Sequence, residues 1–173
     1  MTVSLAPPDT LVSDFRYAMR RLAATVTLVT TSDADGQRYG MLATSVPSVT
    51  MEPPMLLVCV SRTAHVHAAL MARKRMCINV LLDEQAELVQ AFSSSLPHDE
   101  RFANANCQNH TAFDLPYLRD AQALFFCEVD QVVEAGTHSV VLARVLESRA
   151  IDVVRPMVYV DGRMSHLPSS ATA

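Results

Sequence analysis

Glycine is scarce in this sequence. Only Gly36, Gly40, Gly136 and Gly162 occur in 173 residues. A Rossmann fingerprint has the pattern G-x-G-x-x-G, and a P-loop has the pattern G-x-x-x-x-G-K-[ST]. The four glycines are spaced too widely for either pattern. The sequence therefore excludes the usual glycine-rich loops that hold nucleotide phosphates.

Charge is also scarce. Charged residues make up 18% of the chain, where about 25% is usual. The formal net charge is -4, and the arginines are dispersed instead of clustered. This pattern gives no basic surface for nucleic acid. Because half of the residues are hydrophobic, the chain is predicted to fold around a core and not to be disordered.

Long hydrophobic runs are missing. The apolar run from Met55 to Val60 is far shorter than the ~20 residues that cross a bilayer, so no membrane span is expected. The N-terminus lacks the basic and apolar regions of a secretory signal, which predicts a cytoplasmic protein with reduced thiols.

The cysteines and histidines show no metal-binding spacing. The four cysteines include no C-x-x-C pair, and Cys59 and Cys77 lie in apolar runs, where core packing is the favoured interpretation. His65 and His67 are two positions apart in an expected helix, so they point to different sides. No metal site is predicted.

The length predicts one domain. We expect a flexible leader over residues 1–12, the domain over 13–167 and a flexible tail over 168–173. Ser13 is interpreted as the N-cap of an amphipathic helix. Two further helices are expected, beginning near Ala64 and spanning Glu84 to Phe92.

Short strands in hairpin order dominate the rest. Asp35-Gly36 marks a turn between two strands, and Pro47 interrupts the second one. Met55 to Val60 and Met76 to Leu82 are read as strands buried on both faces, and two long strands flank Gly136. Residues 93–116 are polar and aperiodic, either a binding lid or a surface segment. The fold class predicted is mainly β, a closed antiparallel barrel with about three peripheral helices.

Three groups of residues carry possible chemistry. Hydroxyls from Thr44 to Ser48 and at Ser61 and Thr63 can hold a phosphate beside a helix N-terminus, although composition alone favours Thr63 as an N-cap and Arg62 as a solvated charge. His138 begins a strand, where it lines a pocket or ends a surface turn. Tyr159 and Arg163 flank Asp161-Gly162, where they contact a ligand or close a hairpin.

In order and spacing, four blocks resemble the flavin reductase-like family: YGMLATSVPSVTMEPPMLLVCVSRTAHVHAAL, CINVLLDEQAELVQAF followed by Arg101-Phe102, GTHSVVLARV and PMVYVDGRM. The resemblance implies an FMN-binding split β-barrel that works as a homodimer. It implies an NADH- or NADPH-dependent oxidoreductase that transfers hydride to FMN or FAD and supplies a flavin-dependent monooxygenase.

The resemblance also implies site residues. His138 is matched to the catalytic, nicotinamide side of the flavin, with Tyr159, Gly162 and Arg163. The expected flavin contacts are Met41, Ala43, Thr44, Ser45, Val46, Ser48, Ser61, Arg62, Thr63, Ala64, Arg101 and Phe102.

Three positions depart from the family pattern. Thr137 replaces the aspartate of the family's G-D-H motif, a tryptophan downstream of Arg101-Phe102 is missing, and Met164 replaces an aromatic residue. These departures keep an alternative open, a flavin-binding module without reductase activity. A split-barrel oxidase of the pyridoxamine-phosphate type is disfavoured by the matched blocks.

Overall fold

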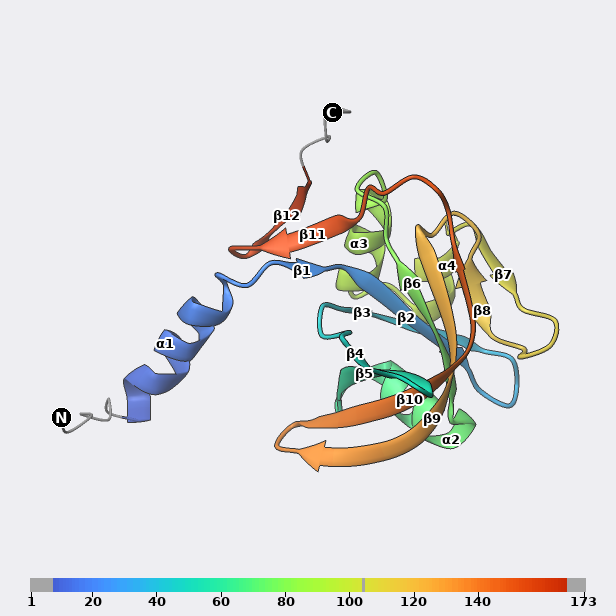
Figure 1. Cartoon of the computed structure of the whole chain (residues 1–173), viewed down its shortest axis with the longest axis horizontal. Helices are drawn as coiled ribbons and strands as arrows, with labels where there is room; N and C mark the ends of the chain where they lie inside the picture. Colours follow the sequence, from blue (N-terminus) through green and yellow to red (C-terminus); the bar gives the residue numbers. More distant parts are fainter. Residues whose placement is uncertain (1–7, 104, 168–173) are drawn as a thin grey trace.

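A computed structural model describes residues 8–103 and 105–167. The expected tail and the first seven residues of the expected leader lie outside these residues. In the described chain, the strands pair antiparallel in three sheets, and four helices lie around them (Figure 1). No helix in these two ranges has both the length and the apolar character needed to cross a membrane.

The largest sheet has seven strands in the order β3-β2-β6-β9-β10-β5-β4. It curls into a barrel, but no ladder of the described residues joins its end strands β3 and β4. The barrel is therefore split there, and the expectation of full closure was wrong. The strands are β2 (Thr27–Ser32), β3 (Arg38–Ala43), β4 (Ser48–Met51), β5 (Pro54–Ser61), β6 (Arg75–Val80), β9 (Ala123–Ala135) and β10 (His138–Ala150).

Smaller elements surround this barrel. A three-stranded sheet joins the beginning and end of the described chain, and a hairpin covers one side of the barrel. The strands are β1 (Ala24–Thr25), β11 (Met157–Val160) and β12 (Arg163–His166), and in the hairpin β7 (Cys107–Asn109) and β8 (Pro116–Leu118). The helices are α1 (Pro8–Met19), α2 (His65–Arg73), α3 (Ala86–Ser93) and α4 (His98–Phe102).

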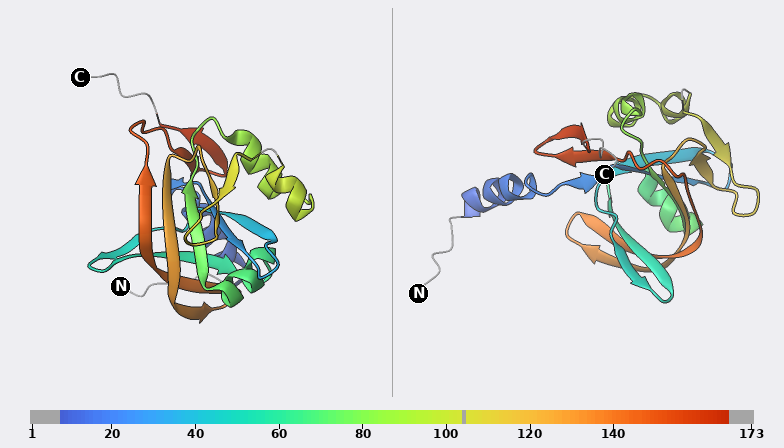
Figure 2. Two further views of the ribbon diagram at one scale, coloured as in Figure 1. Left: turned by 90° about the vertical axis from the view of Figure 1, so that its right-hand side faces the viewer. Right: turned by 45° about the horizontal axis from the view of Figure 1, so that its top comes forward.

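Helix α1 begins earlier than expected. Proline suits the first position of a helix because it has no amide hydrogen to satisfy and its φ is already helical. The helix accordingly starts at Pro8, and Ser13 lies within it, donating to the Thr10 carbonyl at 2.7 Å. The prediction of Ser13 as N-cap was wrong. Figure 1 and the right view of Figure 2 show α1 extending away from the barrel.

Two apolar clusters lie on the two sides of β2 and β6. Leu28 and Cys77 belong to an outer cluster under α3, α4 and β8, whereas Val29 and Ile78 belong to an inner cluster closed by α2. Both faces of these strands are therefore covered, which confirms the prediction for β6. On β5, by contrast, buried and half-buried residues alternate. The prediction that β5 is buried on both faces was wrong.

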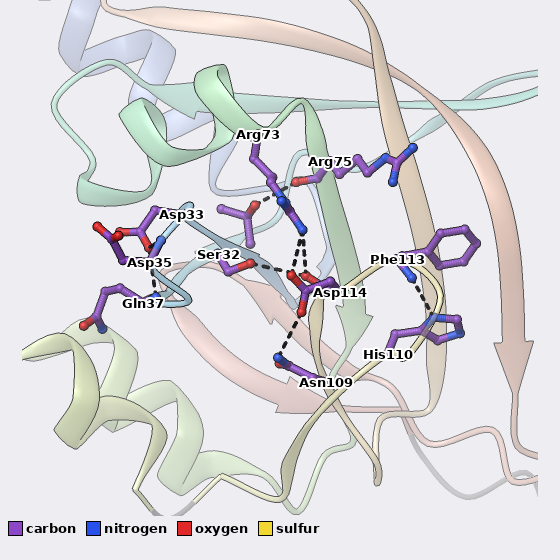
Figure 3. A network of polar contacts seen from close by, with 11 residues as sticks. Ser32, Asp33, Asp35, Gln37, Arg73, Arg75, Asn109, His110, Phe113 and Asp114 are labelled. Carbon is purple, nitrogen blue, oxygen red and sulfur yellow. Dashed lines mark hydrogen bonds and ion pairs between the residues drawn. The ribbon is translucent and has the colours of Figure 1, made fainter.

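Segment 93–116 is part of the packed structure. Thr30 is fully buried in β2, and its hydroxyl donates to the Pro116 carbonyl at 2.5 Å. The Asn79 side chain of β6 accepts from the Leu118 amide, just after the segment, at 2.7 Å. Figure 3 shows a second attachment, where Arg73 of α2 meets the Asp114 carboxylate at 2.9 Å. Ser32 donates to the Asp114 carbonyl at 3.3 Å. These contacts support the interpretation as a fixed surface segment and not as a lid.

Gly40 is required by packing. A Cβ built at this position in β3 would lie 2.6 Å from Phe92 Cε1 and 3.2 Å from Phe102 Cζ. The two rings pack edge to face with centroids 4.9 Å apart. A side chain at position 40 would therefore push the rings of α3 and α4 off the barrel.

We predict that Gly40→Ala lowers the free energy of unfolding by about 1–3 kcal/mol, the usual cost of overpacking a core. Urea denaturation of the variant and of the unmodified protein measures this difference in the free energy of unfolding. In a Phe92→Leu background, where the nearest ring is removed, the same substitution should cost less. An equal cost in both backgrounds would contradict the packing argument.

Candidate functional site

The ladder between β5 and β10 brings together two segments that are far apart in the sequence. His138 pairs with Ser61, Val140 with Cys59 and Leu142 with Leu57. The Arg62 amide also donates to the Thr137 carbonyl at 3.0 Å. The turn between β9 and β10, with His138 after it, therefore lies beside the Ser61–Ala64 segment that leads into α2.

Hydroxyls at the start of α2 are not used to cap the helix. The N-cap is Ala64, without a side-chain cap, so the interpretation of Thr63 as N-cap was wrong. The Ser61 and Thr63 hydroxyls lie 3.0 Å apart and hydrogen-bond each other. Two hydroxyls at the positive end of a helix are suitable donors for a phosphate.

Arg62 is tied to the β9–β10 turn. Its guanidinium donates to the Gly136 carbonyl at 2.7 Å and lies 3.6 Å from the Glu134 carboxylate. Arg62 is thus not a free solvated charge. Arg62 holds the turn before His138 against the Ser61–Ala64 segment. One side chain therefore links these two parts of the site.

The His138 ring is exposed and oriented by its neighbour. The Thr137 hydroxyl lies 2.9 Å from His138 Nδ1 and hydrogen-bonds it. The hydroxyl therefore orients the ring, as a carboxylate at that position would, but without adding negative charge. His138 lies at the mouth of the site and not within a closed pocket.

A groove of about 740 Å³ lies between the β3–β4 connection and the segment that leads from α1 into β2. The connection between these strands forms one wall, and the Ser45 hydroxyl fixes it to β5 by accepting from the Cys59 amide at 3.2 Å. Tyr159 of β11 lines another wall. Of the expected flavin contacts, Thr44, Ser45 and Val46 line this groove. Sequence reasoning missed other lining residues, namely Arg16, Met19, Arg20, Leu22, Ala23, Ala24, Thr25, Thr27, Pro47 and Leu57.

The half-buried face of β5 continues from this groove toward α2. Leu57, Cys59 and Ser61 alternate with buried residues, so they share one face of the strand. Leu57 and Ser61 are separated by about 13 Å along the strand. Cys59, interpreted as core from the sequence, lies between them. Its half-exposure comes from the open side of the split barrel, which the apolar run did not reveal.

Several expected contacts belong to the core. Ala43 is 7% exposed and packs in the inner cluster, where Met41 lies against it. Phe102 is 2% exposed, packed against Phe92 and approached by the Arg38 guanidinium. Its ring is closed to a ligand in this chain, because α4 packs on β3.

The remaining expected residues lie at the margins. Arg101 donates to the Leu96 carbonyl at 2.7 Å and lines a separate cavity of about 340 Å³. Ser48 is exposed on β4. Gly162 has φ +81° in the β11–β12 turn, and Arg163 pairs with Asp161 at 3.4 Å. The structure does not bring these four into the groove wall.

Cys77, Cys107 and Cys127 supply no thiolate for catalysis. Burial raises the pKa of Cys77 well above its ordinary value and that of Cys127 to about 12. Burial also raises the pKa of Cys107. These thiols stay protonated at neutral pH. The groove itself combines apolar side chains with the hydroxyls of Thr25, Thr27, Thr44 and Ser45 and with two arginines, Arg16 and Arg20.

Comparison with known proteins decides the family. Residues 19–168 match the family described as flavin reductase like domain. The chain belongs to this family. An FMN reductase (NADH), RutF, of Variovorax paradoxus is 42% identical over 91% of this chain and 87% of its own. The reductase component of a FADH(2)-dependent resorcinol hydroxylase of a Rhizobium species is 38% identical over 88% and 85%.

A solved structure agrees with this membership. BorF, the flavin reductase component of a bacterial two-component tryptophan halogenase, superposes with a TM-score of 0.83 at 28% identity. The match covers 91% of this chain and 99% of that chain. The split barrel expected from the sequence blocks is therefore confirmed.

Proposed function

We propose that this protein is an NADH-dependent flavin reductase that supplies reduced flavin to a partner monooxygenase. The observation that carries the proposal is the juxtaposition of an apolar groove with the hydroxyls of Ser61 and Thr63 and with His138. The named relatives support it, because they are NADH-dependent flavin reductases or reductase components of two-component systems.

The groove suits a flavin mononucleotide. Its volume of about 740 Å³ is in the range of small-molecule sites, and Val46 and Leu57 offer apolar surface to a planar ring. The ribityl chain would follow the half-buried face of β5 past Cys59. Ser61, Thr63 and the amides at the start of α2 would hold the phosphate, and Arg62 would add positive charge beside them.

Bound flavin would supply the chemistry, by accepting hydride from the nicotinamide. The protein's residues position the reactants. The β3–β4 connection would hold the flavin ring through Thr44, Ser45 and Val46, and Tyr159 would face the space left for the nicotinamide. His138, oriented by Thr137, would contact the nucleotide at the mouth of the site. Gly162 and Arg163 shape the neighbouring turn.

Met41 and Ala43, which pack in the inner cluster, would support the β3–β4 connection from the core side, and Ser48 begins β4 directly after this connection. Arg101 and Phe102 are not included in the proposed site of one chain. A cytoplasmic location remains a prediction, supported by the four free cysteines of the described residues. The domain limits 13–167 also remain a prediction, although α1 already begins at Pro8.

An assay of nicotinamide absorbance tests the function. Purified protein is expected to consume NADH when FMN, FAD or riboflavin is added, and NADPH more slowly. His138→Ala should lower kcat/KM for NADH by roughly tenfold, the effect of losing about 1.4 kcal/mol of hydrogen bonding, with flavin affinity unchanged. No flavin-dependent oxidation by the unmodified protein would favour a non-catalytic flavin-binding module.

The phosphate segment has its own test. Ser61→Ala combined with Thr63→Ala should weaken FMN binding by about tenfold or more, since each hydroxyl donates to a charged group. Riboflavin lacks the phosphate, so its affinity should not change. Flavin fluorescence titration measures both ligands, with the exposed Ser148→Ala on β10 as control. An equal loss for FMN and riboflavin would place the phosphate elsewhere.

We also propose a homodimer. Helix α1 leaves Leu11, Val12 and Phe15 between 59% and 64% exposed, an apolar stripe on an element that stands away from the barrel. A second copy of the chain would cover this stripe.

Sizing with light scattering should therefore give twice the mass of one chain. Leu11→Glu with Phe15→Glu should shift the protein toward single chains, because two charges would enter an apolar contact. Val154→Glu, at a residue 75% exposed between β10 and β11, serves as control and should leave the mass unchanged. A single-chain mass for the unmodified protein would contradict the dimer.

A further inference from the structure

Two arginines line the groove, Arg16 in α1 and Arg20 directly after the end of this helix. The Arg20 amide donates to the Arg16 carbonyl at 3.2 Å, so the two residues are one helical turn apart and share a face. They line the same cavity as Thr44, Ser45 and Tyr159. Ser61 does not line this cavity. The arginines therefore lie toward the end of the groove away from the hydroxyls that would hold the FMN phosphate.

Positive charge is in excess at this end. Arg20, Arg21 and Arg163 surround the Asp161 carboxylate at 3.5, 2.8 and 3.4 Å. The pKa of Asp161 is lowered, because the arginines outweigh the opposing effect of burial. Three arginines therefore share this one carboxylate, in a chain whose net charge is -4.

Arg20 is held in place before any ligand binds. It donates to the Asp161 carbonyl at 2.8 Å, and a Cβ at Gly162 would lie 2.6 Å from Arg20 Nη2. The turn thus has room for the guanidinium only because position 162 is glycine. The Arg16 guanidinium takes part in no ion pair or hydrogen bond among the described residues, so it is available. An ordered guanidinium loses less entropy when it binds a phosphate.

We infer that Arg16 and Arg20 form a subsite for the diphosphate group of a dinucleotide bound in the groove. This inference rests on the proposed function. Guanidinium groups bind phosphate oxygens through paired, charge-assisted hydrogen bonds. The diphosphate belongs either to NADH or to FAD, since both carry one and FMN does not. The subsite would make α1 part of the ligand-binding surface instead of only an association helix.

Isothermal titration with ADP-ribose tests the subsite without catalysis. This probe carries the diphosphate but neither flavin nor nicotinamide. Arg16→Ala should weaken its binding by about tenfold, and Arg16→Lys should recover part of the loss by restoring the charge. Arg16→Ala with Arg20→Ala should weaken it further. Arg119→Ala, at an exposed arginine lining a different cavity, is the control and should have no effect.

Two comparisons identify the source of the diphosphate. If the bound diphosphate is that of NADH, Arg16→Ala should raise the KM for NADH about tenfold. The KM for reduced nicotinamide mononucleotide, which has no diphosphate, should not change. If it is that of FAD, the same variant weakens FAD binding and spares FMN. Unchanged ADP-ribose binding with neither comparison affected would overturn the subsite, as would failure of the unmodified protein to bind ADP-ribose.

The proposed function fails separately. Absence of flavin-dependent NADH oxidation would remove the reductase activity, and arginine-dependent binding of ADP-ribose would still establish the subsite. Conversely, if the arginine variants remain active and bind their ligands as tightly as the unmodified protein, the function stands and the subsite is refuted.

Discussion

The antiparallel ladder between β5 and β10 positions the whole candidate site. Its register places His138 beside Ser61, and the adjacent Arg62 holds the turn through the Thr137 and Gly136 carbonyls. Hydrogen bonding along a ladder is fixed by backbone geometry, so a shift of one residue would turn Leu57, Cys59 and Ser61 away from the groove. The Ser61–Ala64 segment and His138 are thereby held side by side through backbone hydrogen bonds.

The ladder can position a site because the two apolar clusters do not cover both faces of β5. The outer cluster covers β2 and β6 but not the corresponding face of β5. The inner cluster, with Val58 and Val141, fixes the other face of β5 and β10. Stability is therefore provided on one side of these strands, and the opposite side is free for ligands. Asn79 supports the division by tying β6 to β8 across the outer cluster.

The split in the barrel provides the second condition. Full closure would pair β3 with β4 and bury residues 44–47 in a ladder. Instead Pro47 precedes β4, and the connection lies over β5 with Ser45 as its anchor. The groove walls then come from distant parts of the chain: the β3–β4 connection, the β11 strand and α1. Helix α1 is the least constrained of these, and it contributes both cationic and apolar residues.

The sequence by itself determined the β class, the turn at Gly36, most strand positions and the family, because these depend on local periodicity and on contiguous motifs. It also named Thr44, Ser45 and Val46, which line the groove, among the expected flavin contacts. Only the tertiary structure decided that Phe102 and Ala43 are core, that Cys59 is half-exposed on β5 and that Arg16 and Arg20 line the groove. These outcomes depend on which face of each strand is covered by elements distant in the sequence. The physical reason is that burial depends on neighbours in space, and the pattern of one strand does not reveal which of its faces the barrel leaves open.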